Sequence, residues 1–289
     1  MLAAFDRQGT DRSAGRMWCD THLHVYDPCF DYAADATLRP APALAVDYAA
    51  WQKKLGLRRA VVVQPSSYGV DNRCTLSAVK TLGLSTTRAV VVLDGEESDA
   101  CLHAMHACGA RGVRVNALRG GVLDRRRLER LCARVTPLGW HLQLHVDGEQ
   151  LPDLARWIAR LPLPVVLDHF ARMPIGHALQ HAAWPALISL LDSDKVWVKL
   201  SAPYLISKRW AGLFEDVHEA MDRLLTHAPH RMLWGSDWPH PGWHSSTEPR
   251  PDIEQLLDFA VMRLRAHGCV EQVMDENARE LYGFDRTQN

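Results

Sequence analysis

The sequence predicts an α/β fold, specifically a single-domain (β/α)8 barrel of the TIM type. Eight short apolar segments recur along the chain, helical patterns lie between them, and polar residues follow most of them. Eight parallel strands are the number that closes such a barrel, and its usual length of about 250 residues suits one domain here. An open, doubly wound sheet is the alternative. It is disfavoured because no G-x-G-x-x-G motif follows the first segment.

The eight segments have the composition of buried parallel strands. Residues 60–63 and 164–167, for example, are almost continuous apolar runs rich in valine. Strands that helices cover on both faces show such runs, whereas an antiparallel sandwich would show more alternation. The predicted strands are residues 18–25, 59–65, 88–94, 111–117, 140–146, 163–169, 195–202 and 231–237.

Glycines mark the ends of several predicted helices. Gly56, Gly109 and Gly139 each follow a helical pattern and stand shortly before the next strand. A glycine at that point can adopt the left-handed conformation that ends a helix. We expect an N-terminal extension over residues 1–16 and the barrel over residues 17–289.

The overall charge and the cysteine content favour a cytoplasmic protein with a small-molecule partner. The 33 basic and 34 acidic residues give a net charge of -1, which provides no field to attract nucleic acid or an anionic membrane. No segment approaches the roughly 18 apolar residues of a membrane span, and no signal peptide is visible. The seven cysteines show no C-x-x-C spacing, which indicates reduced thiols. A homo-oligomer is compatible with these features.

Polar side chains gather at the carboxyl ends of the predicted strands. In a parallel barrel these ends meet at one face, where the active site lies. A single strand histidine is usually packed in the core, as we expect for His141, but recurrence at equivalent strand ends points to chemistry. The residues at these ends are His22, His24, Gln64, Ser66, Asp94, Arg114, Asn116, His145, Asp168, His169, Lys199, Ser201 and Asp237.

Four of these residues, His22, His24, His145 and Asp237, form a predicted metal site. Imidazole nitrogens and a carboxylate suit zinc, manganese or iron, and a catalytic site leaves a coordination position for water. A bound cation would lower the pKa of that water, and Asp237 could accept its proton. His169 would polarise a carbonyl or protonate the leaving group.

Five motifs carry a resemblance to the amidohydrolase superfamily. The H-x-H of the first strand, the histidines after the fifth and sixth strands, and the aspartate after the eighth are similar to its site residues. More narrowly, the chain resembles the 2-pyrone-4,6-dicarboxylate hydrolase branch, with the motifs in the same order. They are DTHLHVYDP at 20–28, VQPSSYGVDN at 63–72, RGVRVN at 111–116, LDH at 167–169 and WGSDWPHP at 234–241.

This resemblance implies a hydrolase that opens a cyclic ester bearing a carboxylate. Asp237 would activate water, and His169 would act on the carbonyl. Arg114 would bind the substrate carboxylate through its planar guanidinium, although an internal salt bridge is a second interpretation of this arginine. Further substrate contacts are predicted at Ser66, Asn116, Arg119 and His240.

Two departures from the branch affect the expected cofactor and substrate. The dicarboxylate hydrolase has a tyrosine where this chain has His145, and it works without a required metal. The added imidazole favours one divalent metal, zinc first and manganese second, with metal-free catalysis as the alternative. Leu205 stands where the branch often has an arginine that binds a substrate carboxylate. This change favours a lactone with one carboxylate, such as a sugar-acid lactone, over the pyrone dicarboxylate.

Other functions are compatible with the same residues. A sister branch with a similar metal set expels carbon dioxide from its substrates, so a metal-dependent decarboxylase is one alternative and a lactone isomerase is another. A binding protein that retained the site residues is a third. A serine hydrolase is disfavoured because Ser66 and Ser67 lie in no nucleophile-elbow motif.

Overall fold

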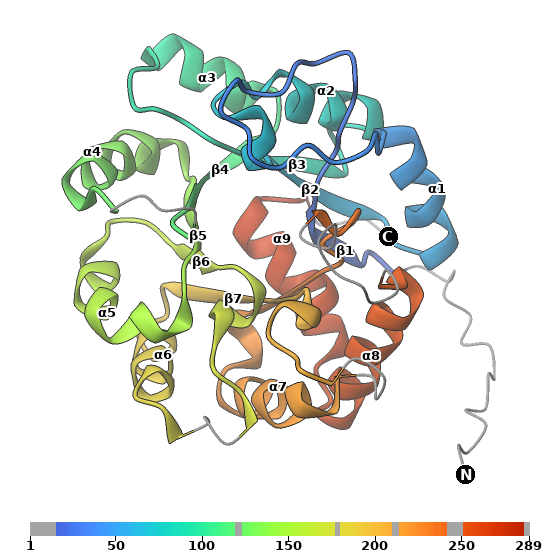
Figure 1. Ribbon diagram of the computed structural model, residues 1–289, viewed down its shortest axis with the longest axis vertical. Coiled ribbons are helices and arrows are strands. Elements are labelled where there is room, and N and C mark those ends of the chain that lie inside the picture. Colours follow the sequence, from blue (N-terminus) through green and yellow to red (C-terminus); the bar gives the residue numbers. More distant parts are fainter. Residues whose placement is uncertain (1–15, 119–122, 177–179, 210–213, 242–250, 286–289) are drawn as a thin grey trace.

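Eight parallel strands form one sheet in the order β1 to β8, and helices surround it (Figure 1). The structure is a computed structural model that describes residues 16–118, 123–176, 180–209, 214–241 and 251–285. It confirms the predicted (β/α)8 barrel. The strands are β1 (Cys19–Leu23), β2 (Arg59–Val63), β3 (Thr87–Val91), β4 (Ala110–Asn116), β5 (His141–His145), β6 (Val165–Leu167), β7 (Val196–Ser201) and β8 (Met232–Gly235).

The barrel closes where β8 meets β1. The Asp237 amide donates a hydrogen bond to the His22 carbonyl (2.8 Å), and the His24 amide donates to the Trp238 carbonyl (2.7 Å). Gly235 permits this approach, because a Cβ there would lie 2.6 Å from the His22 Cβ. Closure therefore sets the end of the last strand directly beside the histidines of the first.

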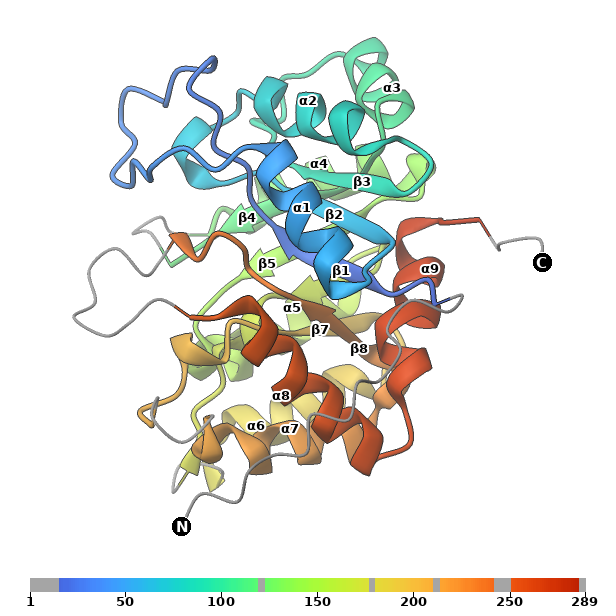
Figure 2. The ribbon, with the colours of Figure 1, turned by 90° about the vertical axis from the view of Figure 1, so that its right-hand side faces the viewer.

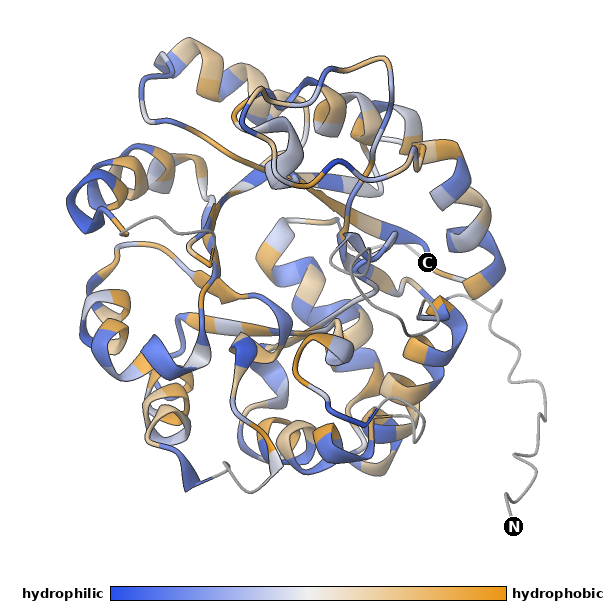
Figure 3. Cartoon of the chain, in the orientation of Figure 1, coloured by the Kyte–Doolittle hydropathy of each residue, from blue (hydrophilic) through white to orange (hydrophobic). Residues whose placement is uncertain are grey.

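The helices lie outside the strands, with their hydrophilic residues on the outer surface (Figure 3). Gly56 (φ 71°), Gly109 (φ 96°) and Gly139 (φ 69°) adopt the expected positive φ values and follow helices or turns. The predicted helix ends are therefore confirmed. The helices are α1 (Ala45–Leu55), α2 (Arg73–Leu82), α3 (Asp99–Ala107), α4 (Arg125–Val135), α5 (Leu151–Arg160), α6 (Ala183–Leu191), α7 (Glu215–His227), α8 (Ile253–Ala266) and α9 (Asn277–Tyr282).

The amino end of the barrel is closed by the segment around α9 (Figure 2). Tyr282 and Phe284 pack in one cluster with barrel side chains such as Val61 and Leu233. His141 is buried as expected, with its ring 5.1 Å from that of Tyr282. Among the described residues, side chains of this segment therefore fill the amino end of the barrel interior. Within the described ranges, no helix has both the length and the apolarity needed to cross a membrane.

Candidate active site and metal centre

A cavity of about 220 Å³ opens among the carboxyl ends of the strands. Seven of the ten predicted site residues line it, together with Arg172 and Leu205. Strand pairing explains part of this convergence, because Asn116 on β4 lies opposite His145 on β5. The seven are His24, Ser66, Arg114, Asn116, His145, His169 and Asp237.

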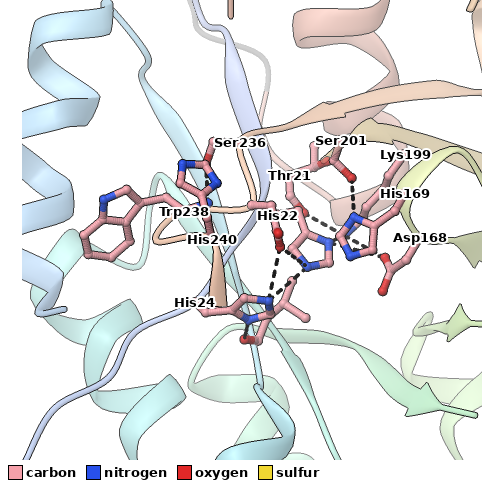
Figure 4. A network of polar contacts seen from close by, with 12 residues as sticks. Thr21, His22, His24, Asp168, His169, Lys199, Ser201, Ser236, Trp238 and His240 are labelled. Carbon is pink, nitrogen blue, oxygen red and sulfur yellow. Dashed lines mark hydrogen bonds and ion pairs between the residues drawn. The ribbon is translucent and has the colours of Figure 1, made fainter. Parts of the chain in front are cut away.

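Three of the four predicted metal ligands, His22, His24 and Asp237, form a compact triangle, and Figure 4 shows the rings of the two histidines next to each other. The Nε2 atoms of His22 and His24 are 3.3 Å apart, and each lies 3.5 Å from Oδ1 of Asp237. Ligand atoms about 2.0–2.2 Å from zinc, at the tetrahedral angle, are about 3.3–3.6 Å apart. The triangle therefore has the dimensions of one face of a tetrahedral site. His24 and Asp237 also line the cavity, so a metal held by the triangle would lie beside it.

Hydrogen bonding gives His24 the tautomer that a metal needs. Its Nδ1 lies 2.7 Å from the Val63 carbonyl, which can only accept, so Nδ1 carries the proton. The Nε2 lone pair is then directed at the triangle. A partner that fixes the distal nitrogen of a ligating histidine is usual in metal sites.

His22 has a carboxylate behind it instead of a carbonyl. Its Nδ1 lies 3.3 Å from Oδ1 of Asp168 and 3.3 Å from Nζ of Lys199, and only the contact with Lys199 meets hydrogen-bond geometry. Burial lowers the pKa of His22 to about 3, so the ring is neutral near pH 7 and offers a lone pair. Asp168 and Lys199 therefore both help to orient the ring of His22.

Asp168 also belongs to a second group of potential ligands, with His22 and His169. Two cations already accompany this carboxylate: Arg114 at 3.3 Å and Lys199 at 4.0 Å. Burial would raise the pKa of Asp168, but the neighbouring histidine and both cations hold it well below its usual range. A carboxylate so compensated attracts a metal less strongly than Asp237 does, so the first triangle is the better centre.

Asp237 is held in a defined orientation by Tyr204. The Tyr204 hydroxyl donates to Oδ2, which leaves Oδ1 directed at the two imidazoles. The aspartate backbone is left-handed, with φ 58°, a conformation that is uncommon outside glycine. Burial would raise the pKa of Asp237, but the facing imidazoles of His169, His24 and His22 lower it below its usual range. The carboxylate is ionised at neutral pH.

A left-handed turn presents His169 and Arg172 to the cavity. All four residues from His169 to Arg172 have positive φ values, between 52° and 55°. This conformation costs about 1–2 kcal/mol per residue and persists only where the surroundings enforce it. The Ser201 hydroxyl contacts His169 Nδ1 (2.9 Å), and Arg172 Nη1 donates to the Leu205 carbonyl (2.8 Å). The start of the turn is thus tied to the last residue of β7, and its end is tied to the segment after β7.

Arg114 joins two roles that the sequence had presented as alternatives. Its Nε and Nη2 atoms each lie 3.3 Å from Oδ2 of Asp168, and Nη1 donates to the Gln64 carbonyl at 3.3 Å. The side chain nevertheless lines the cavity. It shares one carboxylate with Lys199, so this part of the site keeps an excess of positive charge.

Two further predicted site residues, His145 and His240, lie outside the ligand triangle. His145 lines the cavity but is outside the ligand triangle; its ring stands 4.9 Å from that of His169, and neither of its nitrogens has a hydrogen-bond partner. His240 is absent from the described residues that line the cavity. It is buried behind Asp237, with Nδ1 3.1 Å from the Tyr204 hydroxyl, so its position does not fit the predicted substrate contact. Arg119 lies outside the described residues.

Comparison with known proteins agrees with this geometry. The family model described as amidohydrolase matches residues 19–284. The chain belongs to the amidohydrolase family. Its match spans every strand of the barrel, and the triangle stands at the carboxyl end of that barrel.

Three lactone enzymes are similar to this chain, each aligned over 91% of it. A 2-pyrone-4,6-dicarboxylate hydrolase of Comamonas testosteroni is 30% identical, covering 89% of its own length. A 4-sulfomuconolactone hydrolase of Rhizobium radiobacter is 31% identical, also over 89% of its length. A D-galactarolactone isomerase of Agrobacterium fabrum is 26% identical over 90% of its length.

Solved structures share the amidohydrolase barrel. A ligand-free Agrobacterium tumefaciens protein superposes with a TM-score of 0.85 at 25% identity, covering 95% of this chain and 98% of that one. A zinc-bound amidohydrolase of Burkholderia multivorans gives 0.75 at 19% identity, covering 93% and 100%. The second likeness concerns the fold alone.

Proposed function

We propose that this protein is a hydrolase that opens a carboxylate-bearing lactone with the help of one divalent metal, zinc in the first place. The observation that carries the proposal is the triangle of His22, His24 and Asp237, which has the dimensions of a tetrahedral zinc face beside a cavity with two arginines. Lactone hydrolases among the relatives and a zinc-bound protein of the same fold support it.

His22, His24 and Asp237 would hold the metal, with His145 as a predicted ligand that would have to move toward the triangle. When bound, a divalent ion lowers the pKa of water and polarises an ester carbonyl. Manganese is the second choice, and metal-free chemistry is the alternative that the test below must address.

The protein side chains supply the proton transfers. Asp237 takes a proton from the water whose oxygen bonds to the lactone carbonyl carbon. As the ring C–O bond breaks, Asp237 returns that proton to the ring oxygen, and the product is an open hydroxy acid. Tyr204 keeps the carboxylate in place during both steps by its hydrogen bond to Oδ2.

His169 polarises the carbonyl as a neutral donor. Burial lowers its pKa to about 3, which excludes a resting imidazolium near pH 7. With the Ser201 hydroxyl donating to Nδ1, the ring presents Nε2–H to the developing oxyanion. The left-handed turn fixes this direction.

The substrate carboxylate would be bound by Arg114. Arg172 adds a second cation on the wall that carries Leu205, so it compensates for the arginine that the chain lacks there. Ser66 and Asn116 line the same cavity and would contact the lactone. A substrate with at least one carboxylate fits this lining.

A panel of carboxylated lactones, incubated with the metal-loaded enzyme, tests the proposal. We expect a ring-opened acid whose mass exceeds that of the lactone by one water, without gas release. Isomerisation would leave the mass unchanged, which is a real alternative because one relative is a lactone isomerase. Released carbon dioxide would identify a decarboxylase. If the protein binds carboxylates but turns over no lactone in the presence of zinc or manganese, it is a binding protein and not an enzyme.

A further inference from the structure

A second cavity of about 350 Å³ adjoins the proposed active site. The two cavities share Ser66, Arg114 and Asn116 in their linings. The second cavity therefore lies next to the place where the substrate carboxylate would lie. We call it the side chamber. Its apolar lining consists of Val92, Leu93, Val115, Ala117, Leu123, Leu128 and Leu131.

The side chamber runs from the barrel interior, past the end of β3, to the space beneath α4. Side chains alternate along β4, so Arg114 and Asn116 face the interior while Val115 faces the helix layer. Val92 and Leu93 directly follow the last residue of β3, and Leu128 and Leu131 lie on α4. The side chamber lies between these two walls, beyond the last residue of β3.

The polar side chains beyond the shared rim are already bonded within the protein. Gln64 Nε2 donates to the carbonyls of Gly69 (3.2 Å) and Asp71 (2.9 Å). Asp124 caps α4 by accepting from the Arg127 amide (3.0 Å), and Arg127 Nε donates to the Asp94 carbonyl (2.8 Å). A group that enters the chamber therefore meets hydrocarbon, with polar contacts available at the rim shared with Arg114.

We propose that the side chamber receives an apolar substituent, alkyl or aryl, of the lactone whose carboxylate binds Arg114. A polar anchor beside a mainly apolar cavity of this size is the usual composition of a small-molecule site. The proposal rests on the proposed function and deepens it, because it names a lactone with an anionic and a hydrophobic part. Small polar sugar-acid lactones have no group that fills the side chamber, so they are the poorer substrates.

A matched pair of lactones tests this inference. The two carry the same carboxylate and differ by one butyl or phenyl substituent on the ring. We expect kcat/KM for the substituted lactone to exceed that for the plain one by about tenfold or more, because apolar pockets discriminate on this scale for small hydrocarbon groups.

Ala117→Leu fills part of the chamber, and the ratio of the two kcat/KM values should fall at least tenfold in this variant. Val92→Phe obstructs the opposite wall and should lower the same ratio, which keeps the test valid if one variant does not fold. Ala107→Leu is the matched control on an exposed position of α3, and its ratio should equal that of the unchanged enzyme.

The outcomes separate the inference from the function on which it rests. A ratio near one in the unchanged enzyme, or a ratio that neither chamber variant alters, overturns the side-chamber assignment while lactone opening stands. If neither lactone of the pair nor any other in the panel is opened, the proposed function fails, and the assignment fails with it.

Discussion

Both ends of the barrel bury charged side chains, and Arg59 and Arg88 at the amino end find their partners within the chain. Arg59, at the start of β2, pairs with Asp275 and donates to the Asp285 carbonyl (2.8 Å). Arg88, on β3, donates to the carbonyls of Tyr282 (3.3 Å) and Gly283 (3.0 Å). These bonds hold the segment after α9 against the barrel floor.

At the carboxyl end, the charged and polar side chains are also buried, but their hydrogen bonding is incomplete. His22, His24 and Asp237 are at most 3% exposed, yet their inner atoms face one another at 3.3–3.5 Å. A divalent cation could join these two ring nitrogens and the ionised carboxylate, which form one group of potential metal ligands. This difference indicates that the charged residues of the amino end stabilise the fold, whereas those of the carboxyl end are arranged to bind a ligand.

The largest effect should come from Asp237→Asn, because it removes both the base and an anionic ligand. We expect kcat to fall by about 10³-fold, within the range for loss of a general base. Binding of the open carboxylate product should change little, since Arg114 and Arg172 remain. Steady-state kinetics and product titration measure the two quantities. Asp192→Asn, which changes an exposed aspartate, is the control. A near-normal kcat in Asp237→Asn would refute the role of Asp237 as the base.

Arg59→Met examines the opposite end. Removal of a buried, bonded guanidinium leaves Asp275 without its partner and should lower the free energy of unfolding by about 2–4 kcal/mol. Urea unfolding measures this loss, and kcat/KM at a temperature where the variant is folded should be unchanged. Arg73→Met, at an exposed ion pair, should lower the same free energy by about 1 kcal/mol or less. Equal losses in the two variants would contradict the structural role of Arg59.

Arg114→Met should act mainly on substrate binding. Loss of a charge-assisted contact raises KM for carboxylated lactones by about 10- to 100-fold, with a smaller change in kcat. Initial-rate kinetics against an uncharged lactone provides the comparison, because its KM should not rise. Arg125→Met on the exposed side of α4 is the matched control. An unchanged KM would restrict Arg114 to its ion pair with Asp168.

Tyr204→Phe should have the smallest effect of the four. The ring keeps its packing, but Oδ2 of Asp237 loses its donor, so we expect kcat to fall about tenfold while KM is retained. Tyr32→Phe removes a hydroxyl that donates to the Pro40 carbonyl (2.8 Å) and should leave kcat unchanged. A loss of thermal stability in Tyr204→Phe with normal kcat would make its role structural instead.

The fold and the centre of the site were predictable because both follow from regular spacings of residues along the strands. Two histidines two residues apart on β1 share a face, and Asp237 directly follows the last strand, so barrel closure alone brings them together. The eight predicted strands overlap the observed ones, with shifts of a residue or a few at their ends.

The remaining site residues depend on turns that have no such period. Arg172 was missed because it reaches the cavity through four consecutive left-handed residues, which no propensity anticipates. His240 was expected to contact substrate, but the turn after β8 aims it at Tyr204. Tyr204 lies in the turn after β7, and its hydrogen bond to Asp237 is visible only in the three-dimensional structure.

The metal content of active protein tests the central claim most directly. Protein purified without chelator and analysed by mass spectrometry of its metals should contain about one divalent ion per chain, mainly zinc. Chelation should remove the ion and lactone hydrolysis together, and one equivalent of zinc should restore both. Protein that opens its lactone at full rate with far less than one ion per chain would contradict the metal role of His22, His24 and Asp237.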